Sequence, residues 1–144
     1  MSQLDVATPL SELDYARAGL YELLRSKDLE ALAKRPPSGE WSIVENVRHL
    51  LFAEQLHLGK FLPDGFEWSC VGLTQRTGRA YAEVGKDPTD DLEEIFQAWD
   101  AVHVPIREAV KGGGEEVQKG LGRNLKHLVR HRDTIEKLLR KSSA

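Results

Sequence analysis

Two histidines, His127 and His131, stand four residues apart in the segment KHLVRHRDTIEKLLRK, residues 126–141. On a helix they lie one above the other, on the side that also carries Leu128 and Ile135, so the pattern directs them at least partly into a core. Two uncharged imidazoles that lose their hydration need partners. A divalent metal is a partner for both, because histidines at i and i+4 meet its ligand geometry. Two ligands do not make a site, and a third must come from elsewhere in the chain.

The segment WSIVENVRHLLFAEQLHLG offers two candidates for the third ligand, His49 and His57. They are eight residues apart, which on a helix separates them by about 80°. Both border the apolar arc of the segment, so the periodicity by itself leaves the choice between them open.

The elements that must position these side chains are four predicted helices. The first carries leucines at helical spacing from Leu13 to Leu24, with an extension to Leu32, and ends at the prolines of KRPPSGE. The second begins at Ser42, which forms a capping box with Glu45, and ends at LPDGF. The third follows KDPTDD and is stopped by KGGGEE. The fourth is expected from near Gly122 to Lys141.

This pattern predicts an all-α fold, an up-and-down four-helix bundle with an elaborated connection between helices 2 and 3. The connection, residues 63–87, is long for a plain loop and is expected to carry structure of its own. A length of 144 residues predicts a single domain over residues 1–144.

Composition limits the classes of partner. The chain is 40% hydrophobic and 30% charged, with a formal net charge of −3, which gives no electrostatic case for nucleic acid or an anionic membrane. No apolar run approaches the roughly 20 residues of a membrane-spanning helix, and the first residues, MSQLDVATPL, show no secretory signal. The single cysteine, Cys70, excludes an internal disulfide and fits a reducing compartment. The protein is expected to be cytoplasmic.

Two stretches carry a resemblance to a known family. WSIVENVRHL has a Trp-Ser helix start with a histidine eight residues after the Trp, and LKHLVRHRDTIEKLL has HxxxH on the last helix. In this order and separation they resemble the two signatures of the DinB/YfiT family of metal-dependent proteins, and the four-helix reading agrees over most of the chain. The resemblance implies that His49, His127 and His131 bind a divalent ion, typically zinc or nickel.

Four further residues are candidates for the surroundings of the site. Asn124 precedes His127 by three residues on the same side and can hydrogen-bond a ligand or a substrate. His103 lies on the apolar face of the third helix, where a packed histidine with a backbone partner is the competing interpretation. Glu54 can serve as a base or form an ion pair, and His57 is a spare ligand or a rim residue. Trp41 is expected to close the end of the bundle.

The function that the resemblance implies is that of a metal-dependent S-transferase. In such an enzyme a metal bound by three histidines activates a low-molecular-weight thiol, such as bacillithiol, mycothiol or glutathione, or a water molecule, toward a small-molecule substrate. No catalytic side chain is assigned. The alternative is a non-enzymatic binding module with a structural or vestigial metal site. A homodimer is expected in either case, because four-helix bundles pair readily through an exposed helix face.

Overall fold

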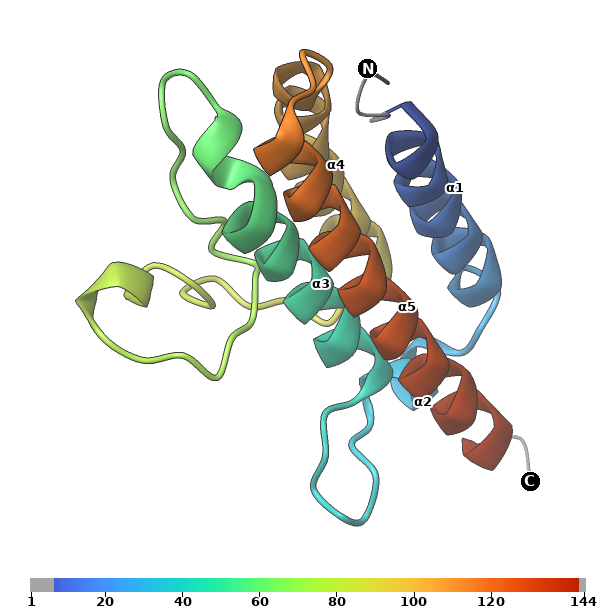
Figure 1. Ribbon diagram of the computed structural model, residues 1–144. Coiled ribbons are helices and arrows are strands. Elements are labelled where there is room, and N and C mark those ends of the chain that lie inside the picture. Colours follow the sequence, from blue (N-terminus) through green and yellow to red (C-terminus); the bar gives the residue numbers. More distant parts are fainter. Residues whose placement is uncertain (1–6, 143–144) are drawn as a thin grey trace.

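The computed structural model describes residues 7–142 as a set of packed helices, with no strand in that range (Figure 1). The α-helices and 3-10 turns are α1 (Ala7–Leu24), α2 (Leu29–Ala33), α3 (Ile43–Leu58), η1 (Gly59–Phe61), η2 (Arg79–Tyr81), α4 (Leu92–Val110) and α5 (Glu115–Ser142). The all-α class is confirmed. The expected absence of a secretory signal concerns residues 1–6 in part, and these lie outside the described range.

Side-chain caps fix where α3 and α4 begin. Ser42 Oγ accepts a hydrogen bond from the amide of Glu45, and the Glu45 carboxylate accepts one from the amide of Ser42, so the predicted capping box is present. At the start of α4, Asp91 accepts from the amides of Glu93 and Glu94. These caps satisfy amide groups that have no partner inside the helix.

α3 and α5 pack against each other in opposite directions. Asn46, in the first turn of α3, contacts His131 in the second half of α5, whereas His57, near the end of α3, contacts Asn124 earlier in α5. α1 and α4 are antiparallel in the same way, since Asp14 meets His103 while the later Tyr21 of α1 meets the start of α4.

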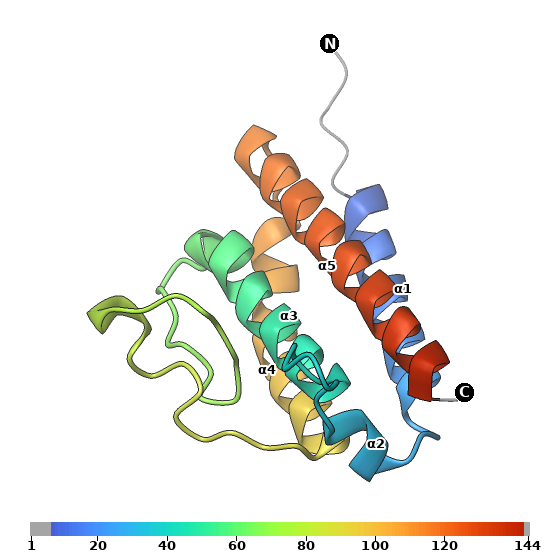
Figure 2. The ribbon, with the colours of Figure 1, turned by 90° about the horizontal axis from the view of Figure 1, so that it is seen from below.

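α3 and α4, in contrast, run in the same direction (Figure 1, Figure 2). Arg48 lies near Asp90 at the start of α4, Glu54 contacts Trp99 in its middle, and Leu62 shares a cavity with the end of α4. The four long helices therefore do not alternate in direction along the chain, unlike the expected up-and-down order. The reason is the connection over residues 62–91, which is long enough to return the chain to the end where α3 began.

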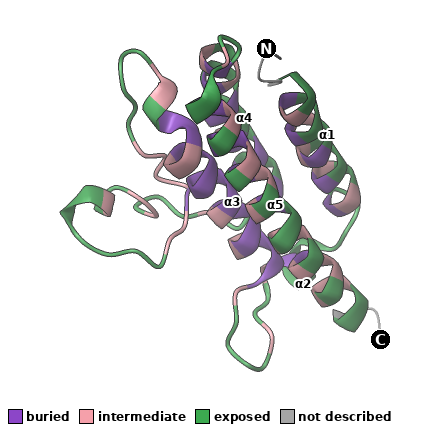
Figure 3. Cartoon of the chain, in the orientation of Figure 1, coloured by how far each residue is buried: buried purple, intermediate pink, exposed green. Residues whose placement is uncertain are grey.

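Buried apolar side chains occupy the facing sides of the long helices (Figure 3). The fully buried set of large residues is Leu13, Leu20, Leu24, Leu32, Leu51, Phe52, Leu58, Ile95, Trp99, Ile106, Leu121 and Leu128. Among the described helices, none is long and apolar enough to span a membrane.

Two predicted helix bounds differ from the structure. α1 ends at Leu24, and the leucines beyond it belong to the separate α2. The intervening segment contains Ser26 and Asp28, residue types that favour turns and caps over helix interiors. α5 begins at Glu115, seven residues before the predicted start near Gly122, so the glycines at 120 and 122 lie inside it.

Gly120 has a packing reason for its place in α5. A Cβ atom at this position would lie 3.0 Å from Leu58 Cδ2 and 3.2 Å from the carbonyl oxygen of His57. The absence of a side chain therefore lets α5 approach the end of α3 closely, which sets the spacing of the two helices that carry the predicted ligands.

Candidate metal centre

Three imidazole rings meet where α3 and α5 pack together. His49 comes from α3, and His127 and His131 come from successive turns of α5. One ring nitrogen of each lies within 4.8 Å of the others, and His49 Nε2 is 3.2 Å from His127 Nε2. The ring centroids are 4.4 to 5.0 Å apart. We call these three residues the histidine cluster.

In two of the three rings, a hydrogen bond to one nitrogen leaves the other nitrogen free to bind a metal. His49 Nδ1 lies 2.8 Å from the carbonyl oxygen of Leu73, and His131 Nδ1 lies 2.8 Å from Asn46 Oδ1. Because both oxygens only accept, both Nδ1 atoms carry the proton and donate. The Nε2 atoms of His49 and His131 are left with lone pairs, the form in which a metal is ligated.

Asn46 is held so that only its oxygen can face His131. Its Nδ2 donates a hydrogen bond of 2.9 Å to the carbonyl oxygen of Ser42. Ser42 is the residue that caps α3. The orientation of the amide therefore follows from the start of the helix, and the amide in turn fixes the ring of His131. Carbonyl and amide oxygens commonly orient metal-ligating histidines in this way.

All three imidazoles are uncharged at neutral pH. Burial and, to a smaller extent, the neighbouring rings of His131 and His49 together lower the pKa of His127 to about 3. Burial also lowers the pKa of His131 to about 4 and moves the pKa of His49 below its usual value. Neutral imidazole is the form that binds a divalent cation.

The distance between the nitrogens of His49 and His127 fits such a cation. Two nitrogens bound to a tetrahedral ion at the usual bond lengths lie about 3.3 Å apart, close to the 3.2 Å between His49 and His127. His127 Nδ1 is buried and has no hydrogen-bond partner within the described residues. Buried imidazoles that lack an opposite charge have most to gain from a bound cation.

A cavity of about 570 Å³ opens beside the cluster. Its lining residues are Arg35, Gly39, Glu40, Trp41, Asn46, His49, Gln75, His131 and Thr134. Trp41, expected to close the end of the bundle, instead lines this cavity, with its ring centroid 4.9 Å from that of His49. A small molecule in the cavity would reach both α3 and α5 ligands.

His57 and Asn124 form a pair next to the cluster. His57 Nδ1 is 3.0 Å from Asn124 Oδ1, and its ring centroid is 5.7 Å from that of His127. The expected partner of Asn124 was a ligand or a substrate, whereas the observed hydrogen bond goes to His57. Of the two histidines of α3, His49 is the one that joins the cluster.

Glu54 and His103 belong to a different group. The Glu54 carboxylate accepts from Trp99 Nε1 at 3.0 Å and lies 2.7 Å from His103 Nδ1. His103 Nε2 lies 2.7 Å from Asp14, which also pairs with Arg107. We call Glu54, His103 and Asp14 the ionic chain. It supports the ion-pair interpretation of Glu54, and the partners of His103 are carboxylates where a backbone group was expected.

The connection between α3 and α4 is tied to the cluster through its backbone. Arg48 donates to the carbonyl oxygens of Val71 and Gly72, and the next carbonyl, that of Leu73, accepts from His49. Asn46 and Leu73 were not among the residues expected at the site. Asn46 stands one helical turn before His49, and this spacing could have indicated that it lies near the cluster. A backbone carbonyl such as that of Leu73 has no sequence signature.

A larger cavity lies elsewhere among the described residues. It measures about 850 Å³ and is formed between residues 62–69 of the connection and α4. Its lining is mostly apolar, including Phe66, Val102 and Pro105, and none of the three clustered histidines belongs to it. Size alone would place a ligand here, but the cluster's chemistry favours the smaller cavity.

Comparison with known proteins gives one match. A family model described as the DinB superfamily matches residues 12–140 of the chain. No curated protein and no solved structure matches it. The matched range includes α3 and α4 completely, together with most of α1 and α5 and all three histidines of the cluster.

Proposed function

The chain belongs to the DinB superfamily, and we propose on this basis that His49, His127 and His131 hold a divalent ion, zinc or nickel. The observation that carries the proposal is the meeting of three uncharged imidazoles from α3 and α5, two of them with their outer nitrogens already hydrogen-bonded. Three protein ligands are the number found in catalytic sites, whereas closed structural sites have four.

The proposed activity is the transfer of a low-molecular-weight thiol of the bacillithiol, mycothiol or glutathione type to an electrophilic small molecule, with water as the alternative nucleophile. A bound divalent ion would supply Lewis acidity, which favours the thiolate over the thiol and acidifies water. The overall reaction forms a sulfur–carbon bond, releases the leaving group from carbon and releases the thiol proton to solvent.

The chain's own residues contribute orientation and a place for the substrate. Asn46 and the Leu73 carbonyl fix two of the imidazole rings, which keeps the donor nitrogens in place without rearrangement. The rings of Trp41 and Phe52 lie against His49 and restrict the positions that its ring can take. The cavity beside the cluster has room for a small molecule.

The alternative is a non-enzymatic, dimeric binding module. Tyr15, with 83% of its surface exposed, and Val129 line a shallow apolar groove between α1 and α5, which favours pairing of two copies through this face. A homodimer is compatible with either function. The cavity beside the cluster favours the enzyme, because a purely structural ion needs no open space.

The proposal is tested by measuring metal content. The wild type and His127→Ala are purified without a histidine tag, and their metal content is measured by inductively coupled plasma mass spectrometry. We expect about one equivalent of metal in the wild type and almost none in the variant, since two ligands hold zinc poorly. Retention of a full equivalent by folded His127→Ala would refute the assignment.

The matched control is His103→Gln. This variant also removes a buried histidine, but one that belongs to the ionic chain. It should keep one equivalent of metal. Thiol conjugation of an electrophile such as 1-chloro-2,4-dinitrobenzene is then assayed with the metal-loaded protein, and activity that survives full metal removal would contradict a metal-dependent transferase.

A further inference from the structure

A second cavity lies near the one beside the histidine cluster. Arg35 lines both. The second cavity measures about 390 Å³ and lies between α2, the segment that precedes α3, and the last turns of α5. It is lined by Ala31, Lys34, Arg35, Pro36, Pro37, Ile43, Leu138 and Lys141.

One face of α5 runs along both cavities. His131 and Thr134 line the first, and Leu138 and Lys141 line the second, at the three- and four-residue spacing of a single helix face. From His131 to Lys141 the helix rises about 15 Å. A small molecule of that length could therefore place one end at the cluster and the other beside Lys141.

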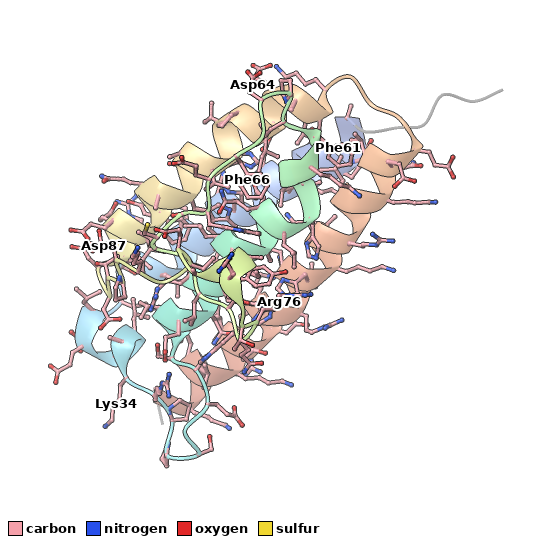
Figure 4. The ribbon with its side chains drawn as sticks, turned by 90° about the vertical axis from the view of Figure 1, so that its left-hand side faces the viewer. Lys34, Phe61, Asp64, Phe66, Arg76 and Asp87 are labelled. Carbon is pink, nitrogen blue, oxygen red and sulfur yellow. The ribbon has the colours of Figure 1, made fainter. Side chains whose placement is uncertain are left out.

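The second cavity combines positive charge with an apolar wall. Its three charged side chains, Lys34, Arg35 and Lys141, are all cationic. Its remaining lining residues, Ala31, Pro36, Pro37, Ile43 and Leu138, are apolar. Lys34 lies close to α2, at the end of the bundle opposite Phe61 (Figure 4).

The cations are available to a ligand. Over residues 7–141, neither Lys34 nor Lys141 has a carboxylate within salt-bridge distance. Arg35 is held by two hydrogen bonds from its Nε and Nη2 to the Glu45 carboxylate, which neutralises part of its charge but also fixes the guanidinium in place. Its Nη1 donates to no described residue and remains for a further acceptor.

We infer that this second cavity is an anion subsite, which binds the carboxylate end of a small molecule whose reactive end lies at the histidine cluster. The inference rests on the proposed function and narrows it to reactions in which the thiol or the electrophile carries a carboxylate. The simplest source of the carboxylate is the thiol itself, which would favour an acidic thiol over an uncharged one. The sequence shows no such cluster, because residues 34, 35 and 141 come together only in the fold.

The test compares the binding of three probes by isothermal titration calorimetry. Glutathione carries a thiol and two carboxylates, S-methylglutathione keeps the carboxylates but blocks the thiol, and glutathione diethyl ester blocks the carboxylates. Each is titrated into metal-free and zinc-loaded protein, for the wild type and for the double variant Lys34→Ala/Lys141→Ala. Both lysines are exposed, so the variant should fold, which circular dichroism checks.

In the double variant we expect glutathione and S-methylglutathione to bind about tenfold more weakly, and the diethyl ester to bind as in the wild type. The control is Lys137→Ala, which removes an exposed lysine of the same helix that lines neither cavity. The inference is overturned if the control weakens binding as much as the double variant, or if no carboxylate probe loses affinity.

A second arm separates the thiol from the electrophile as the source of the carboxylate. Here 4-chloro-3,5-dinitrobenzoate, an electrophile with a carboxylate, replaces glutathione as the titrated probe, with 1-chloro-2,4-dinitrobenzene as its uncharged analogue. Weakening of this probe alone assigns the subsite to the electrophile. If the proposed function is wrong, the wild-type protein takes up no zinc. If the subsite is wrong, the metal-free double variant binds the carboxylate probes as tightly as the metal-free wild type.

Discussion

Histidine side chains are buried at two sites in the protein, and their pKa values shift in opposite directions at the two sites. In the histidine cluster, burial and the neighbouring imidazoles together lower the pKa of His127 to about 3. In the ionic chain, burial also lowers the pKa of His103, but the hydrogen bonds and charges of Glu54 and Asp14 outweigh this effect and raise the pKa above its usual value. The first set of rings is neutral, whereas the second ring is an imidazolium.

The difference lies in what faces each ring. His103 has a carboxylate on each ring nitrogen at 2.7 Å, so both nitrogens must donate and the charge is already balanced. The rings of the cluster face one another and have no carboxylate among their hydrogen-bond partners in the described residues. A balanced ion serves to hold helices together, whereas uncharged rings that converge on one point are suited to receive a cation. One helix, α3, supplies a member of each group, His49 and Glu54.

The largest effect should come from breaking the ionic chain. We expect Glu54→Ala to lower the free energy of unfolding by about 3–5 kcal/mol, because it removes one of the two carboxylate partners of the buried His103 and leaves the buried indole N–H of Trp99 unpaired. Urea denaturation measures the loss, and elemental analysis should still find one equivalent of metal in the folded protein. If the alanine variant does not fold, Glu54→Gln tests the same charge with its shape kept. A loss below about 1 kcal/mol in both variants would mean that the ionic chain contributes little to the stability of the folded protein.

A smaller effect, confined to metal affinity, should follow from removing the support of one ring. Asn46→Ala removes the acceptor that orients His131 and should weaken zinc binding by about 10- to 100-fold, measured by competition with a chromogenic chelator. Asn124→Ala is the matched control, because it removes an equally buried amide that bonds to His57. Equal weakening in the two variants would show that general packing, and not the orientation of His131, controls affinity.

The smallest effect is the part of the pH dependence of stability that belongs to His103, since the lowered pKa values of the histidine cluster give a dependence of the opposite sign. Since the pKa of His103 is raised in the folded state, its stabilising contribution is complete below its unfolded value of about 6.5 and is lost as the pH rises through the folded value. The difference in the free energy of unfolding between the wild type and His103→Gln, both metal-free and unfolded with urea, should be larger at about pH 6 than at about pH 9. A difference that does not change with pH would show that His103 does not contribute in this way.

The members of the cluster could be named from the sequence, whereas their support could not. The spacing of HxxxH on the last helix predicts His127 and His131, whereas only the family pattern selects His49 over His57. The role of Asn46 depends on which way its amide faces, which the carbonyl of Ser42 decides, and the role of Leu73 depends on the path of the connection. Similarly, Lys34 and Lys141 look like ordinary surface charges until the fold places them in one cavity.

The helices show the same division between local and tertiary information. The start of α3 was predictable because the capping box of Ser42 and Glu45 is local. The early start of α5 was missed because Gly120 reads as a helix breaker, while its actual role is a close contact with α3. The direction of α4 depends on where a long connection ends, and periodicity carries no information about that.

The shared direction of α3 and α4 also affects how the protein can change during evolution. The connection must span the length of α4, about 28 Å, which about nine extended residues could cover. The chain uses about 30 residues for this purpose. The segment is therefore longer than the span requires, and outside residues 71–73, which bind Arg48 and His49, changes in its length need not move the helices. Because it also supplies Gln75 to the cavity, such changes would alter the cavity beside the histidine cluster.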